Sequence, residues 1–221
     1  MSTTQNGSVT APLAASSDIG RLLFEASRRA EAMGLVEPHS MAHLRGSGAP
    51  GSTAEIADIK AVRHIAQQAR KAGIAAATAS ALNNVEAPTR EELASLLRMM
   101  ITALEASPVP KFEWAGLARV FDVEQLSSLL DVSISSLKRY QSGERATPDA
   151  VAARLHFLVL VVSDLAGSYN DIGIRRWFHR RRTLLDGRAP VHLLAGDWDP
   201  DEPGPRRVRE LAGELVSLSA T

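Results

Sequence analysis

Cysteine is absent from this sequence of 221 residues. Without it the chain cannot form disulfide bonds, and it cannot use a thiolate as a metal ligand or as a nucleophile. A chain without cysteine suits a reducing compartment, so the cytoplasm is the expected location.

Long apolar runs are absent as well. No segment reaches the roughly 20 apolar residues that a membrane-spanning helix needs, and the N-terminal stretch MSTTQNGSVTAPLAASSD lacks the charged start and apolar core of a signal peptide. We therefore expect a cytoplasmic protein without a membrane partner.

The chain also lacks an excess of either charge. Lysine and arginine together number 25, as do aspartate and glutamate. Any binding to nucleic acid must then come from a local basic patch rather than from net charge. Hydrophobic residues make up 45% of the chain, which suffices for one large or two small domains with an apolar core.

Signatures of catalysis and of metal binding are missing too. No nucleophile elbow, phosphate-binding loop or dinucleotide fingerprint occurs. His39 and His43 have the spacing of two ligands on a helix face, but they lie in a stretch rich in proline and glycine without a third ligand. The acidic segment from Asp197 to Glu202 lacks the central glycine of a calcium loop, so we expect it to be solvated. We predict that the protein is not an enzyme and needs no cofactor or metal.

Apolar residues recur with the period of a helix along most of the chain, and no segment has a convincing strand pattern. Helices are expected from Asp18 to Met33, from Ser52 to Lys71 and from Thr89 to beyond Leu104. The last two each begin with a serine or threonine three residues before a glutamate, as in a capping box. The sequence therefore predicts an all-α helical bundle.

Changes in pattern divide the chain into four regions. Residues 1–17 are expected to be disordered, and residues 18–107 to form an N-terminal helical region that ends at the proline-rich stretch SPVP. Residues 108–168 are expected to form a second helical domain. Its last helix, for which Thr147 is the predicted N-cap and Pro148 the first residue, is apolar nearly all round and should be the buried axis. Residues 169–221 form the C-terminal region.

Within residues 108–168, the stretch VEQLSSLLDVSISSLKRYQSG predicts a helix-turn-helix. Leu126, Leu129 and Leu130 give the first helix an apolar face. Val132 lies under the predicted turn, and Ser133 can cap a second helix that directs Leu137 and Tyr140 to the core.

The opposite side of that second helix is polar. Its candidate DNA-contacting residues are Ser133, Ser135, Ser136, Lys138, Arg139 and Gln141. Side chains of these types donate hydrogen bonds to base edges and phosphates, and a helix of this kind suits the major groove of double-stranded DNA. The alternative is that two short amphipathic helices simply pack together.

A second basic cluster follows, formed by Arg175, Arg176, Arg180, Arg181, Arg182 and Arg188. Three interpretations stay open for it: a solvated face, a surface that follows phosphates beside the recognition helix, or a docking site for an acidic partner.

The C-terminal region resembles the antitoxins of the Xre/MbcA/ParS type. Ile174 to Trp177 match the tryptophan helix of that family. The turn that follows it, L-x-G-R-x-P-x-x-L-L, is matched by Leu185, Gly187, Arg188, Pro190, Leu193 and Leu194. The resemblance covers roughly Phe112 to Leu215 and leaves the N-terminal helical region as an addition.

The resemblance implies an antitoxin of a type II toxin-antitoxin system. Such a protein represses its own operon by binding an operator and neutralises a partner toxin, commonly a RES-domain enzyme that degrades NAD. Residues 169–221 would then be the toxin-binding region. Its candidate partner contacts are Arg180, Arg181, Arg182, Arg188, Arg206, Arg207 and Arg209. The alternative is a stand-alone helix-turn-helix regulator without a toxin.

A repressor of this kind normally presents two recognition helices, so we expect a homodimer. An apolar stripe in the N-terminal region is the candidate contact, although such a face more often packs against its own chain. The stripe consists of Leu93, Leu96, Leu97, Met100 and Leu104.

Overall fold

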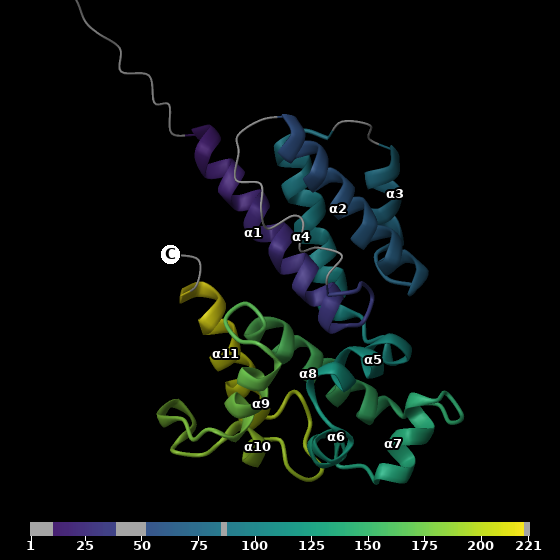
Figure 1. Ribbon diagram of the computed structural model, residues 1–221, viewed down its shortest axis with the longest axis vertical. Helices are drawn as coiled ribbons and strands as arrows, with labels where there is room; N and C mark the ends of the chain where they lie inside the picture. Colours follow the sequence, from purple (N-terminus) through teal and green to yellow (C-terminus); the bar gives the residue numbers. More distant parts are fainter. Residues whose placement is uncertain (1–10, 39–51, 85–87, 219–221) are drawn as a thin grey trace, which may run out of the picture.

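The computed structural model describes residues 11–38, 52–84 and 88–218. All regular structure in these ranges is helical, which confirms the predicted all-α class (Figure 1). None of these helices is both long and apolar enough to cross a membrane.

The helices form two groups, one above the other in Figure 1. The upper group is α1 (Ala11–Ala32), α2 (Ser52–Lys71), α3 (Ala76–Asn84) and α4 (Arg90–Ala106). The lower group is α5 (Pro110–Val120), α6 (Val123–Leu130), α7 (Ile134–Gln141), α8 (Asp149–Leu165), α9 (Asp171–His179), the short 3-10 helix η2 (Thr183–Leu185), α10 (Pro190–Leu193) and α11 (Pro203–Leu218).

Helix α1 begins earlier than predicted. Its first residue is Ala11 rather than Asp18, so the expectation that all of residues 1–17 are disordered is wrong for residues 11–17. The segment APLAASS is rich in alanine, the strongest helix former, and this favours an extension of the helix without any apolar period. His39 and His43 lie outside the described residues, as do the side chains of the predicted Ser52 capping box.

Helix α4 confirms the helix and the capping box that the sequence predicted here. Thr89 accepts a hydrogen bond from the backbone N–H of Glu92, and the Glu92 carboxylate accepts one from the backbone N–H of Thr89, which completes the capping box. Five residues of the apolar side are buried against the same chain, mainly against α1: Leu93, Leu97, Met100, Ile101 and Leu104. The stripe therefore packs within the chain and does not offer the dimer contact considered for it.

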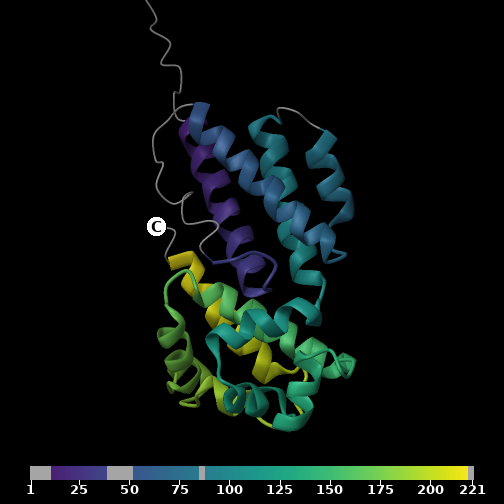
Figure 2. The same ribbon diagram turned by 45° about the vertical axis from the view of Figure 1, so that its right-hand side comes forward.

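Helix α8 lies at the centre of the lower group, as the sequence predicted, and contacts α1, α5, α6 and α11 (Figure 2). The predicted N-cap is wrong by one residue. Pro148 occupies the cap position, and Thr147 instead accepts a hydrogen bond of 3.0 Å from the indole Nε1 of Trp114. The threonine thus joins α5 to the start of α8 rather than capping the helix.

The two groups are in close backbone contact where the end of α1 meets α5. A Cβ atom on Gly116 would lie 2.0 Å from the carbonyl oxygen of Ala32 and 3.0 Å from the backbone nitrogen of Gly34. Gly34 has φ +72°, a conformation that L-amino acids with side chains rarely adopt. Both glycines are therefore required for this backbone contact.

Buried polar groups also join the two groups of helices. His156 of α8 lies between the Glu113 carboxylate (Nδ1 to Oε1, 2.5 Å) and the backbone carbonyl of Glu105 (Nε2 to O, 2.8 Å). Burial lowers the pKa of His156, but the hydrogen bond and the charge of Glu113 outweigh this effect, so its pKa lies above the usual 6.5. The imidazolium form thus contributes to the stability of the fold.

Replacing Gly116 by alanine should therefore destabilise the protein by about 3 kcal/mol, because the new methyl group meets backbone atoms that cannot move aside. The urea midpoint measures this loss. Gly20→Ala is the matched control: nothing lies within 4 Å of the new Cβ, and alanine is the better helix former, so its midpoint should rise slightly. Equal midpoints for the two variants would contradict the close contact.

A second prediction concerns pH. Because the pKa of His156 is raised in the folded state, the stability from its protonation is complete below pH 6.5 and is lost as the pH rises through the folded-state pKa. The melting temperature of the wild type should therefore fall, relative to His156→Gln, as the pH rises from 6.5 through the raised folded-state pKa of His156. Melting curves that stay parallel over this range would show that the histidine is not charged at low pH.

Candidate nucleic-acid interface and arginine surface

Helices α6 and α7 are joined by the turn Asp131–Ser133, with the bounds that the sequence predicted. Asp131 ends α6 in the left-handed conformation, with φ +52°. Ser127 donates a hydrogen bond of 2.6 Å to the carbonyl of Val132, and Ser133 accepts one of 3.2 Å from the backbone N–H of Ser136. Each residue of the turn thus has a defined partner or conformation.

The inner side of this helix pair is apolar and buried. It consists of Leu126, Leu129, Leu130, Leu137 and Tyr140. Tyr140 stacks against Trp114 of α5, with ring centroids 6.2 Å apart. The core side of α7 is therefore fixed, and this sets which of its residues face the solvent.

The outer side of α7 carries the candidate DNA contacts. Ser133, Ser135, Lys138, Arg139 and Gln141 are exposed, and Ser136 is half-buried. Arg139 is held by an acid, since its Nε lies 2.9 Å from Glu144 Oε1. Ile134, the first residue of α7, is also 38% exposed. Sequence reasoning assigned Ile134 no contact, yet an apolar side chain here can touch a thymine methyl group.

Charge is unevenly distributed over the two helices. The exposed acids Asp122, Glu124 and Asp131 lie at the ends of α6 or on it. Lys138, Arg139 and Arg145 lie on α7 or directly after it, and the Arg145 guanidinium stands over the Tyr140 ring at 5.6 Å. A polyanion would therefore be attracted to α7 and repelled by α6.

Two residues that the sequence analysis did not single out hold the end of α6 in place. The buried indole of Trp198 donates a hydrogen bond of 2.8 Å to the carbonyl of Leu129. The buried guanidinium of Arg154 donates to the carbonyls of Leu130 (3.2 Å) and Trp198 (2.5 Å), and it pairs with Asp197. The last carbonyls of a helix lack partners within the helix, and these bonds satisfy two of them.

The acidic loop around Trp198 is only partly as expected. Asp197, Asp199, Asp201 and Glu202 are exposed, in line with a solvated loop. Trp198 itself is only 3% exposed and contacts Phe157 of α8 edge-to-face. The loop therefore has a structural role as the support of α6.

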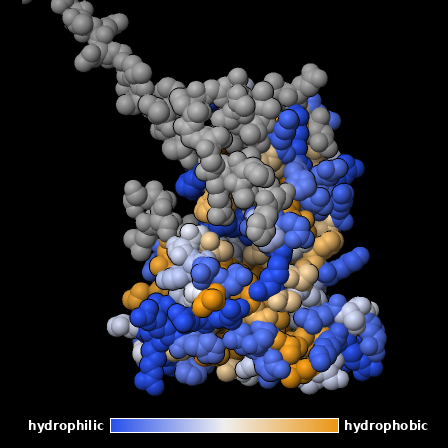
Figure 3. Space-filling model, viewed as in Figure 1, coloured by the Kyte–Doolittle hydropathy of each residue, from blue (hydrophilic) through white to orange (hydrophobic). Residues whose placement is uncertain are grey.

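Helix α9 carries the first arginines of the second cluster. Asn170 caps it by accepting a hydrogen bond from the backbone N–H of Gly173. Arg175 donates to the carbonyl of Val120 (2.6 Å), and the half-buried Arg182 stands over the Trp177 ring. In Figure 3 hydrophilic residues gather over this part of the molecule, with small hydrophobic areas between them.

The remaining candidate arginines fall into two sets. Arg180 and Arg181 are exposed, and the described part of the chain gives them no ion-pair partner; Arg188 is exposed and 4.0 Å from Asp186. The others make contacts within the chain. Arg206 pairs with Asp201 (3.2 Å), and Arg207 pairs with Asp186 (2.7 Å) and donates to the Leu184 carbonyl.

Arg209, one of the expected partner contacts, forms ion pairs within the chain. It pairs with Asp164 and lies 3.6 Å from Glu105, inside the junction between α11, α8 and α4. Burial, together with the nearby charge of Arg29, lowers its pKa to about 10. Two further residues of α11, Val208 and Ala212, are fully buried. The last helix is therefore part of the core rather than a free arm.

The turn between α9 and α11 uses the backbone preferences of glycine and proline. Gly187 adopts φ +74° directly after Asp186 at φ +55°, and Pro190 is the first residue of α10. Both residues thus shape the backbone of the turn.

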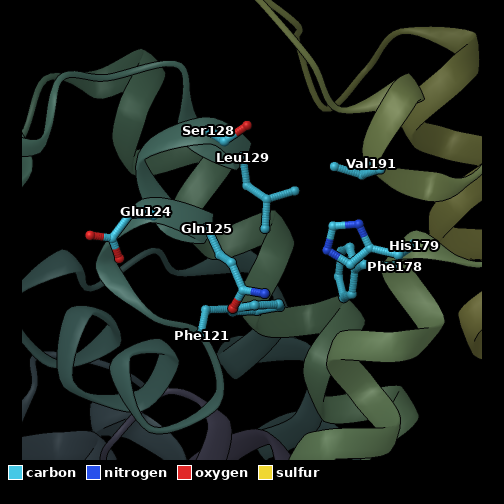
Figure 4. A pocket seen from close by; sticks show the side chains of 8 residues that line it. All are labelled: Phe121, Glu124, Gln125, Ser128, Leu129, Phe178, His179 and Val191. Carbon is cyan, nitrogen blue, oxygen red and sulfur yellow. The ribbon is translucent and has the colours of Figure 1, made fainter.

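A cavity of about 240 Å³ opens between α6 and α9, on the side of α6 that faces α10. Its apolar lining is Phe121, Leu129, Phe178 and Val191. Figure 4 shows the Leu129 side chain directed toward His179 and Val191, while the carboxylate of Glu124 points away from them. This cavity was not foreseen, because its walls come from three helices that are separated in the sequence.

Comparison with known proteins identifies a relative of this chain. No protein-family profile matches it, and no solved structure matches it. The fold and the site define an all-helical protein with exposed basic surfaces. Over 98 residues the chain is 33% identical to a probable mycobacterial cidal antitoxin of Mycobacterium tuberculosis, a match that covers 43% of this chain and 78% of the relative. The chain belongs to the family of this antitoxin.

Proposed function

We propose that this antitoxin binds DNA through a helix-turn-helix made of α6 and α7, represses its own operon and neutralises a partner toxin. The observation that carries the DNA-binding part is the outer face of α7, where exposed hydrogen-bond donors stand opposite a fixed apolar face. Membership of an antitoxin family supports the toxin-binding part. The resemblance to Xre/MbcA/ParS antitoxins makes a RES-domain enzyme the toxin class to test first.

In this proposal α7 lies in the major groove. Arg139 and Gln141 are the candidates for base contact, Lys138 for phosphate contact, and Ile134 for contact with a thymine methyl group. Operator specificity requires two such helices, so the proposal includes a homodimer. Its contact must come from a surface other than the buried side of α4.

Replacing Arg139 by alanine should weaken binding to the promoter DNA of its own operon by about 1–3 kcal/mol and reduce sequence discrimination, because a base contact is lost. Lys138→Ala should weaken binding to all DNA sequences to a similar extent. It should also reduce the slope of log affinity against log salt concentration by about 1. Fluorescence anisotropy with promoter and scrambled duplexes at several salt concentrations measures both effects.

Arg70→Ala is the control, because Arg70 is an exposed arginine of α2 in the upper group of helices. Its affinity for DNA should equal that of the wild type. Failure of the wild type to bind promoter DNA at low salt would contradict the proposal. An equal loss of promoter affinity in Arg70→Ala and Arg139→Ala would contradict it as well.

The second candidate function is a stand-alone regulator without a toxin. The two functions can be distinguished with the protein encoded next to this chain. An antitoxin function requires that this neighbour binds the chain and inhibits growth when it is expressed alone, and a stand-alone regulator requires neither.

A further inference from the structure

The cavity between α6 and α9 continues onto an outer shelf. The cavity lining includes Gln125 and His179, and these two residues also line the shelf, together with Ile172, Arg175, Arg176 and Arg180 of α9 and its end. The cavity and the shelf thus form one groove, which we call the α6–α9 groove. It has an apolar floor at one end and arginines at the other.

The arginine end of the groove is electrostatically unsatisfied. Arg176 and Arg180 are exposed, and no acid of the described residues pairs with them. Arg175 uses one nitrogen for the carbonyl of Val120. The one carboxylate among the lining residues, Glu124, points away from the cavity (Figure 4). The groove therefore presents net positive charge to a ligand.

The groove also exposes apolar surface beside these charges. Ile172 is 53% exposed at the edge of the shelf, although it lies on the same helix as the buried Trp177 and Phe178. A DNA backbone would pair with the arginines but would leave Ile172 and the apolar floor in contact with water. A polypeptide with both acidic and apolar side chains satisfies all of these groups. In Figure 1, moreover, α7 lies on the far side of α6 from α9.

We propose that the α6–α9 groove binds an acidic segment of the partner toxin. One apolar side chain of that segment fills the cavity over Phe121, Leu129 and Phe178, and its carboxylates pair with Arg176 and Arg180. Fully enclosed apolar anchors are the residues that contribute most to such interfaces. The proposal rests on the proposed antitoxin function, and it assigns the toxin contact to a groove built mainly from α6 and α9 rather than to the last helix.

The test uses the full chain and the toxin encoded beside it, with binding measured by calorimetric titration. Ile172→Asp and Arg176→Glu should each weaken toxin binding about ten-fold or more, and the double variant further, because they add negative charge opposite an acidic segment. Two matched controls lie on the upper helices. Met99→Asp changes an apolar residue that is 51% exposed on α4, and Arg70→Glu reverses an exposed charge on α2.

The outcomes separate this proposal from the proposed function. Loss of toxin binding in the α9 variants alone, with unchanged melting temperature and promoter affinity, supports the groove. Toxin binding equal to wild type in these variants overturns the groove but leaves the antitoxin function standing. If the α9 variants lose DNA binding instead of toxin binding, the arginines contact DNA phosphates, and the proposal that the groove binds the toxin is overturned. Failure of the wild type to bind the toxin overturns both.

Discussion

The carboxylate of Asp164 determines how the two groups of helices meet. It lies at the end of α8, is 4% exposed, and pairs with Arg29 of α1 (3.5 Å) and with Arg209 of α11. A buried carboxylate is costly unless it is paired and hydrogen-bonded. The fold therefore requires α1 and α11 to pack on α8 together. Arg28 strengthens this junction by donating to the backbone carbonyls of Ser163 and Asp164 (3.0 Å each).

This junction sets the geometry of the surfaces that we assign to function. With α8 fixed between α1 and α11, Arg154 of α8 can reach the end of α6, and the loop with Trp198 is held against Phe157. These contacts fix α6, which is at once the support of α7 and one wall of the α6–α9 groove. The buried ion pairs of Asp164 thus help to position both candidate interfaces, the outer face of α7 and the α6–α9 groove, although they lie in neither of them.

Local features of the fold could be predicted from the sequence. The Thr89 capping box, the turn after Leu130 and the apolar face of α4 each depend on residues within a few positions of one another, so local chemistry was sufficient to identify them. The start of α1 was missed because alanine favours a helix without any apolar period. Gly187 and Pro190 adopt the conformations that their intrinsic backbone preferences favour.

The candidate sites were harder to predict, because their residues meet only in three dimensions. Arg206, Arg207 and Arg209 form a single basic run in the sequence, yet the fold pairs them with Asp201, Asp186 and Asp164 respectively. Trp198 looked like part of a solvated loop because only its acidic neighbours give a local signal. The α6–α9 groove has no signature at all, since α6 and α9 are separated by the whole of α7 and α8.

The N-terminal helices pack on the lower helices as part of one fold, so the two groups should unfold together rather than as separate domains. Differential scanning calorimetry of the full chain tests it most directly. Because Arg28, Arg29 and the contact at Gly116 join α1 to the lower helices, we expect one transition whose calorimetric and van't Hoff enthalpies agree. Two separate transitions, with the N-terminal helices melting on their own, would contradict the claim.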